Sequence, residues 1–207
     1  MLTINITEPE MPEELKRLPE FLANPKPLLA AGGKQLAGDL QDHFGIRNDQ
    51  PNKRGWPKKN FWAGIRSATA LAEVSDDSAT VSISDPAINQ KVFGGTITPK
   101  RGKMLAIPEN ADAYMAGSPR NLPAGFLRIL VSRSGGVYLV ENDSSLRPKG
   151  KRGSKPAMSF AGRFWYHLVP SVTQDPDPNA LPNEDYLYGS VLYAIRNVME
   201  TKIERTA

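Results

Sequence analysis

Proline and glycine punctuate this chain so often that most of its regular elements must be short. The 207 residues include 18 Pro and 17 Gly, and these fall between segments with apolar periodicity. Proline lacks a backbone donor for a helix or sheet, and glycine adopts conformations closed to other residues. The sequence therefore predicts short elements joined by ordered loops and extended arms.

Helical spacing of apolar residues marks three main segments, 27–44, 60–74 and 184–204. In each of them the apolar residues recur three or four positions apart, which gives one apolar face. Shorter helical turns are expected at 86–93 and 109–115. We expect each of the three longer helices to pack on a core or on a neighbour.

Alternation of apolar and polar residues marks the strands. Short strands are expected at 2–6 and 80–84, and a longer one at 160–172, where both faces carry aromatic or apolar side chains. Turn residues between paired strand signals predict hairpins over 95–108 and 127–140.

The element pattern predicts an α+β fold: a small mixed or antiparallel sheet with long helices packed on one side, plus a protruding hairpin and loops. Residues 1–26 read as an N-terminal strand and extended arm, and 27–207 as a single domain. Within that domain we expect mobile loops near 45–59, 99–103 and 144–158, because these stretches combine turn formers with bases and lack periodicity.

Several classes of site lack the residues that they need. The chain has no Cys, and its two histidines, His43 and His167, do not have metal-ligand spacing. Gly94 and Gly95 do not form a dinucleotide fingerprint, and no serine sits in a nucleophile elbow. We therefore expect no enzyme activity, no metal and no cofactor. No stretch approaches a membrane span, so we expect no membrane contact.

Charge is distributed unevenly along the chain. The net charge is +4 and the sequence pI is about 9.3. Basic residues concentrate at 47–66, 100–103 and 147–155, whereas acidic residues gather at 8–20 and 175–185. Such an arrangement suits head-to-tail contact between copies, although a solvated surface without a partner would have the same pattern.

The basic loops and hairpin tip supply the candidate interaction residues. They are Trp56, Lys58, Lys59, Pro99, Lys100, Arg101, Lys103, Arg147, Lys149, Lys151 and Arg152. Trp62 and Trp165 fall in periodic apolar segments and are expected in the core. Trp56 sits in a basic loop, where it could equally pack or stack on a nucleic-acid base.

Two stretches carry a family resemblance. NKRGWPKKNFW at 52–62, followed by VFGGTITPKRGKMLAIP at 92–108, resembles the virion morphogenesis and tail-completion proteins of Mu-like prophages. The order of the later segments, as far as the C-terminal helix, is similar too, so the resemblance spans about residues 30 to 205. No catalytic residue comes with it.

The resemblance implies a structural assembly protein of a long-tailed phage or prophage. Such a protein is added during tail completion or head-tail (neck) joining, and it acts by protein contacts as a plug or homo-oligomeric ring. The implied partners are other tail or neck proteins. The implied location is the bacterial host cytoplasm during assembly and then the virion.

Two other interpretations stay open on the residues alone. A nucleic-acid-binding module could use the basic loops around Trp56, Lys100 and Lys149, and DNA contact would also fit a protein at a DNA channel. An undescribed hydrolase is a third interpretation, since the absence of a motif is weak evidence.

Overall fold

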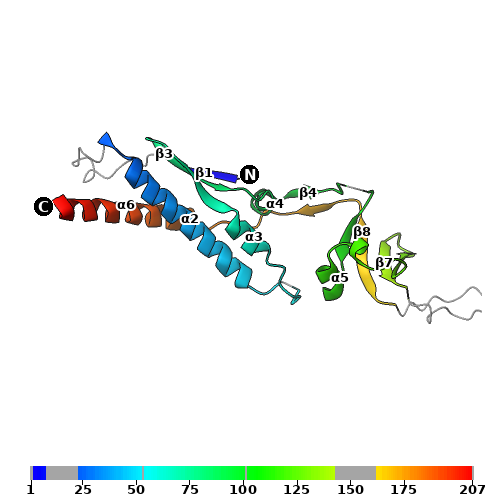
Figure 1. Cartoon of the computed structure of the whole chain (residues 1–207). Helices are drawn as coiled ribbons and strands as arrows, with labels where there is room; N and C mark the ends of the chain where they lie inside the picture. The colour runs from blue at the N-terminus through cyan, green and yellow to red at the C-terminus, as the bar shows by residue number, and fades with distance from the viewer. Residues whose placement is uncertain (1, 8–22, 53, 101, 143–161, 207) are drawn as a thin grey trace, which may run out of the picture. The chain divides into compact units, whose positions relative to one another are not determined.

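The computed structural model describes residues 2–7, 23–52, 54–100, 102–142 and 162–206. Their contacts divide the chain into two compact units, each made of separate stretches of sequence (Figure 1). The first unit comprises Met1–Gln50, Asn60–Gly95 and Asp175–Ala207, and the second comprises Pro51–Lys59 and Thr96–Gln174. We expected one core over 27–207, and the described residues instead form two hydrophobic clusters, one in each unit.

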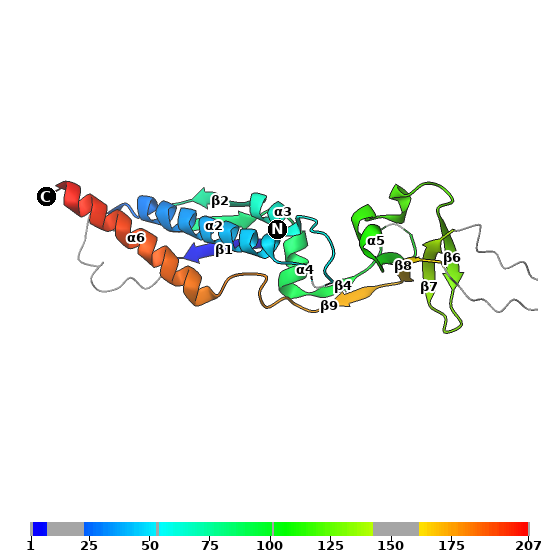
Figure 2. The same cartoon turned by 90° about the horizontal axis from the view of Figure 1, so that it is seen from below.

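The first unit has an antiparallel sheet covered by helices. Its elements are β1 (Leu2–Thr7), α2 (Lys26–Asp49), α3 (Phe61–Ser67), β2 (Thr69–Val74), β3 (Ser78–Ile83), α4 (Ala87–Phe93) and α6 (Glu184–Thr206). The strand order is β1-β3-β2, with β3 in the centre. Helix α2 packs on β2 and β3 and also on α6, which runs beside it (Figure 2). Helix α2 is therefore the element that joins the sheet to the C-terminal helix.

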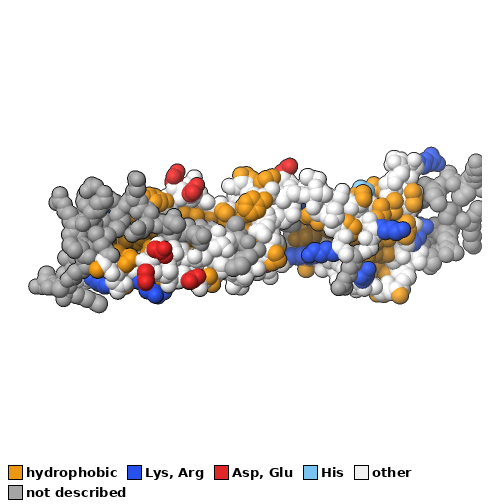
Figure 3. Space-filling model, turned by 90° about the horizontal axis from the view of Figure 1, so that it is seen from above, with side chains coloured by type: hydrophobic (Ala, Val, Ile, Leu, Met, Phe, Trp, Pro, Cys, Tyr) orange, Lys and Arg blue, Asp and Glu red, His pale blue; other side chains and the backbone are white. Residues whose placement is uncertain are grey.

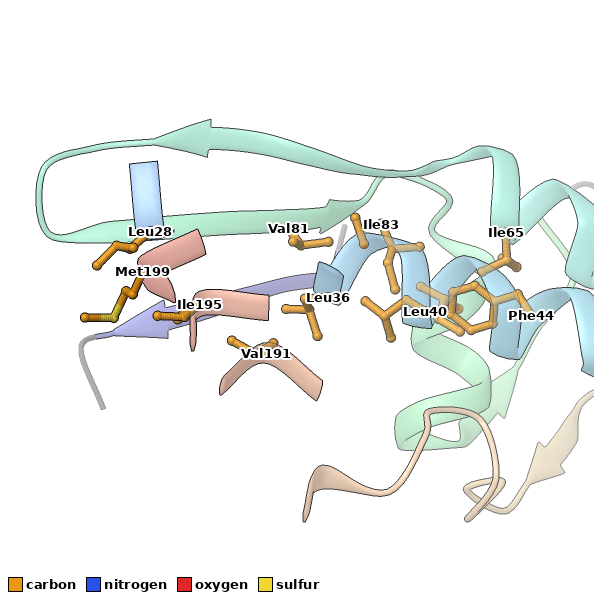
Figure 4. Close-up of a cluster of buried hydrophobic side chains, with 12 residues drawn as sticks. Leu28, Leu36, Leu40, Phe44, Ile65, Val81, Ile83, Val191, Ile195 and Met199 are labelled. Carbon is orange, nitrogen blue, oxygen red and sulfur yellow. The ribbon is translucent and has the colours of Figure 1, made fainter. Parts of the chain in front are cut away.

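A row of buried apolar side chains runs along α2 (Figure 4). Its members come from five elements: Leu28, Leu36, Ala37, Leu40 and Phe44 of α2, Ile65 of α3, Val81 and Ile83 of β3, Ile88 of α4, and Val191, Ile195 and Met199 of α6. Burial of this many aliphatic and aromatic side chains is the main stabilising term for the unit.

Two adjacent glycines let α2 approach its neighbours closely. A Cβ placed on Gly32 would lie 3.1 Å from Val191 Cγ1 of α6. A Cβ placed on Gly33 would lie 2.6 Å from Leu71 Cδ1 and 3.0 Å from Ala79 Cβ, both in the sheet. The missing side chains therefore set the spacing on both sides of the helix.

Most sequence-based predictions for the first unit are confirmed. Strands occur where 2–6 and 80–84 were expected, and helices where 27–44, 86–93 and 184–204 were expected. Local periodicity was sufficient for the three helices and for 80–84 because each of these segments buries one face against the same core.

Two boundaries in the first unit were predicted wrongly. The helix expected over 60–74 ends at Ser67, and Thr69–Val74 forms β2, paired with β3 in an antiparallel register. The turn that follows β2 allows this hairpin, and pairing with a strand of the core outweighs the helical spacing of alanine and leucine. The loop expected over 45–59 begins later, because α2 continues to Asp49.

The second unit is built on a four-stranded antiparallel sheet of order β5-β8-β7-β6. Its elements are β5 (Leu105–Pro108), α5 (Ala111–Ala116), the short 3-10 helix η2 (Pro119–Asn121), β6 (Leu127–Val131), β7 (Val137–Glu141) and β8 (Phe164–Val169). A separate pair of strands, β4 (Gly95–Ile97) and β9 (Val172–Gln174), completes the fold (Figure 2).

The core of the second unit is small and aromatic. Tyr166 of β8 is fully buried, and its hydroxyl donates to the carbonyl oxygen of Ala113 in α5 at 3.0 Å. Trp165 packs edge-on against Phe126, with ring centroids 4.9 Å apart. These contacts hold α5 and the segment before β6 on one face of the sheet. Trp165 thus lies in the core, as predicted.

The hairpin predicted over 95–108 does not form. Strand β4 pairs with β9, and β5 pairs with β8, so both partners come from the later part of the chain. The strand expected over 160–172 is divided into β8 and β9, with Pro170 between them. Local turn signals could not reveal these long-range pairings.

The remaining predictions for the second unit have mixed outcomes. The hairpin expected over 127–140 is confirmed as β6 and β7, with Ile129 opposite Leu139. The short helix expected over 109–115 is confirmed as α5. The loop expected near 144–158 lies outside the described residues.

We predict that Gly33→Ala destabilises the first unit, because its new methyl group meets Leu71 and Ala79 closer than van der Waals contact. Overpacking of this kind costs about 1 to 3 kcal/mol, which exceeds the helix-propensity gain of about 1 kcal/mol. Gly38→Ala is the matched control, since nothing lies within 4 Å of its added Cβ. Urea unfolding should give a lower midpoint for Gly33→Ala and an equal or higher one for Gly38→Ala. Equal midpoints for the two variants would contradict the close-packing account.

Candidate functional site

Three of the predicted interaction residues, Trp56, Lys58 and Lys59, lie in a segment of the second unit that is fastened to α5. The Arg54 guanidinium carbon lies 4.8 Å from the centre of the Trp56 ring. The centres of the Trp56 and Tyr114 rings are 5.3 Å apart. Lys59 Nζ lies 4.4 Å from the centre of the Tyr114 ring. We call Arg54, Trp56, Lys59 and Tyr114 the aromatic–basic cluster.

The local sequence explains how the segment reaches this position. Asn52 Oδ1 accepts from the Arg54 backbone N–H at 2.9 Å, and the Gly55 N–H donates to the Asn52 carbonyl oxygen at 2.8 Å. Gly55 has a φ of +68°, which favours glycine. Arg54 Nη1 then donates to the Pro108 carbonyl oxygen at the end of β5, at 3.3 Å. The turn therefore directs both Arg54 and Trp56 onto the body of the unit.

The side chains of the aromatic–basic cluster contact one another within the second unit. Trp56 is half-buried and already contacts two side chains of its own unit. Cation–π contacts at such partly exposed positions contribute about 0.5 to 1 kcal/mol each. The geometry favours the packing interpretation of Trp56 over a free platform for base stacking.

The other predicted site residues divide into two groups. Pro99, Lys100 and Lys103 lie between β4 and β5, with both lysines exposed, and none of them takes part in the described contacts of the aromatic–basic cluster. The remaining five predicted interaction residues lie outside the described residues; they are Arg101, Arg147, Lys149, Lys151 and Arg152.

Sequence reasoning missed a set of contacts that fix the acidic arm after β9. Arg47, near the end of α2, pairs with Asp177, and its guanidinium carbon lies 4.8 Å from the centre of the Trp62 ring. The Asp177 backbone N–H donates to the Lys91 carbonyl oxygen at 2.8 Å. These contacts hold the start of the acidic 175–185 stretch against the unit that contains it. The two ends of the ion pair lie too far apart in sequence for a local signal.

His43 also contacts this arm. Its Nε2 donates to the Asn179 carbonyl oxygen at 3.1 Å. Burial lowers the pKa of His43, the hydrogen bond to Asn179 opposes that shift, and the nearby Arg47 charge adds to it. His167 stacks on Tyr138, with ring centroids 4.6 Å apart, and its Nδ1 lies 3.9 Å from Glu109 Oε1. Both histidines therefore have structural neighbours.

Among the described residues, no group of three or more His, Asp or Glu side chains is placed to hold a metal ion. An open hollow of about 590 Å³ lies on the second unit, between the 119–125 segment and residues Leu127 and Leu139. Arg120 is the one charged side chain in its lining. The hollow is thus an apolar depression with a basic side chain at its wall.

The two units carry opposite charge. By sequence, the first holds 18 acidic and 10 basic side chains, a net charge of −8, and the second holds 4 acidic and 16 basic, a net charge of +12. Together these give the 22 acidic and 26 basic side chains of the chain and its net +4. On the face seen in Figure 3, the acidic side chains lie over the first unit and most of the Lys and Arg side chains over the second, while hydrophobic side chains lie over both.

Comparisons with models of protein families, with curated proteins and with solved structures each found no match for this chain. In the described part of the chain, no helix combines the length and the apolar character needed to cross a membrane.

We predict that His43 makes the first unit less stable as the pH falls. The pKa of His43 in the folded chain is below its ordinary value of 6.5, so the unfolded chain binds the proton more readily. The contribution of His43 to the free energy of unfolding is therefore complete above pH 6.5 and is lost as the pH falls below 6.5 and through the lower pKa of the folded chain. Melting temperatures at about pH 7.5 and about pH 5.5 should differ less for His43→Gln than for the unchanged protein. His167 is present in both proteins, so its contribution cancels, and an unchanged difference would refute the prediction.

Proposed function

We propose that this chain is a structural assembly protein of a long-tailed phage or prophage, acting in tail completion or head-tail (neck) joining through protein contacts. The observation that carries the proposal is the division of charge into a unit of net −8 and a unit of net +12. Opposite charges on two separate bodies give one chain two unlike surfaces, which is what assembly by successive docking requires.

Several features of the two units support this proposal. The hollow beside Leu127 and Leu139 is open and lined mostly by apolar residues, and the two histidines and the aromatic–basic cluster have partners within the chain. The 52–62 and 92–108 stretches carry the resemblance to tail-completion proteins. On this proposal the partners are other tail or neck proteins, and the chain passes from the host cytoplasm into the virion.

A ring is the assembly that the charge division favours. If the acidic unit of one copy meets the basic unit of the next, the contact is heterologous, and repetition closes it into a ring when the rotation permits. Such contacts steer association at low ionic strength and weaken as salt is added.

The proposal predicts that the chain is a component of particles. After prophage induction, particles separated on a density gradient should contain this chain in tails or in joined virions, detected by antibody. Deletion of its gene should leave heads and tails that fail to join, and the intact gene supplied in trans should restore joined virions. A chain absent from tails and virions, with particles unaffected by the deletion, would overturn the proposal.

A second candidate function, nucleic-acid binding, is favoured by the same +12 unit and by the exposed Lys58, Lys100 and Lys103. Binding through such charges loses about a thousandfold or more in affinity between about 50 mM and about 200 mM salt when several phosphates are contacted. Fluorescence anisotropy with labelled DNA across that range tests it. No binding at the lower salt would remove this function and leave the assembly proposal intact.

A further inference from the structure

The four-stranded sheet of the second unit ends in two edges of different character. At one edge, β5 has four residues and includes Pro108, which has no backbone N–H. At the other edge, β6 has the sequence LRILV, with no proline, glycine or acidic residue. Among the described residues, no strand pairs with the outer side of β6. An edge proline is therefore present on β5 and missing from β6, whose one charged residue is Arg128.

Hydrogen bonds at both ends of the β6–β7 hairpin show which backbone groups of β6 face outward. The Ser132 N–H donates to the Gly136 carbonyl oxygen at 2.8 Å, and the Asn142 N–H donates to the Phe126 carbonyl oxygen at 2.8 Å. In an antiparallel pair, hydrogen-bonded positions alternate, so 128 and 130 also bond to β7. The N–H and carbonyl groups of Leu127, Ile129 and Val131 consequently point away from the sheet.

The side chains of the same three residues make an apolar surface on one face of the sheet. Ile129 is 68% exposed and Val131 is 63% exposed, and their positions alternate with Arg128 and Leu130 on the other face. Leu127 lines the hollow together with Leu139, the residue opposite Ile129. A strand paired with the outer edge of β6 would therefore place every second side chain on this apolar face, beside Ile129, Val131 or the hollow.

Charge determines which kind of strand fits. Arg128 lies on the face of β6 opposite Ile129, where the acidic side chains of an added strand would lie, Arg133 follows β6 in the turn, and the unit as a whole carries a net +12. A second copy paired edge to edge would bring two such units together, with repulsion between them. An acidic segment is attracted to the same surface.

We infer that the outer edge of β6 binds an extended segment of a protein partner, with alternating apolar and acidic residues, as an added strand. Main-chain hydrogen bonds to Leu127, Ile129 and Val131 supply affinity, and the hollow beside Leu127 accepts the apolar side chains. The inference rests on the proposed function only in taking the partner to be another assembly protein.

The test uses the purified chain and a short, labelled peptide of alternating glutamate and valine. Fluorescence anisotropy should show saturable binding that weakens with salt, and no binding of the matching lysine–valine peptide. Ile129→Pro removes one outward N–H without removing a β6–β7 hydrogen bond, and should weaken binding by at least about tenfold. Ile129→Thr keeps that N–H and is the matched variant, expected to stay within about threefold of the unchanged chain.

Amide hydrogen exchange on the unchanged chain gives a second readout that needs no variant. The glutamate–valine peptide should protect the N–H groups of Leu127, Ile129 and Val131 and leave those of Arg128 and Leu130 unchanged. Equal binding of the two peptides, equal binding by both Ile129 variants, or protection at Arg128 and Leu130 instead would overturn the inference. A dimer of the free chain that protects the three outward N–H groups would assign the edge to a second copy and overturn it too. Particle incorporation does not enter this experiment, so failure here leaves the proposed function standing.

Discussion

The first unit depends on one helix being packed on two sides at once. Helix α2 contacts the sheet through Gly33 and contacts α6 through Gly32, so adjacent positions without side chains set both distances. The buried leucines that follow fill the space that this spacing defines. The far end of the same helix carries Arg47, which reaches the arm before α6 through Asp177. A shift of α2 would therefore disturb the sheet, the C-terminal helix and the arm together, because close-packed interiors transmit such displacements.

Elements whose structure depends on local periodicity could be predicted from sequence, and elements whose partners are distant could not. The β6–β7 hairpin and α6 follow from alternation, turn residues and helical spacing. Strand β2 has the composition of a helix and becomes a strand because β3 pairs with it. The failure at 95–108 is of the same kind, since β5 and β8 are brought together by the fold and by no signal near either.

The candidate functional site could be predicted from the sequence only in part, for the same reason. Trp56 and Lys59 could be selected as basic-loop residues, but Tyr114, which contacts both of them, comes from α5 and carries no signal in its own neighbourhood. The sequence also indicated clusters of charged residues, but not how these clusters are divided between the two units. By sequence, one unit is acidic and the other is basic, and in the proposed function this division provides the surfaces for protein docking. Surfaces of opposite sign on one chain suit successive assembly steps better than a single binding cleft would.

Zero-length carbodiimide cross-linking of purified particles, read out by mass spectrometry, tests this account most directly. The reagent joins carboxylates to amines only where they are in contact, so it reports charged docking between chains. The account predicts cross-links from carboxylates of the first unit or lysines of the second unit to other virion proteins or to neighbouring copies. Cross-links confined to pairs within a single chain, in particles that contain the protein, would contradict it.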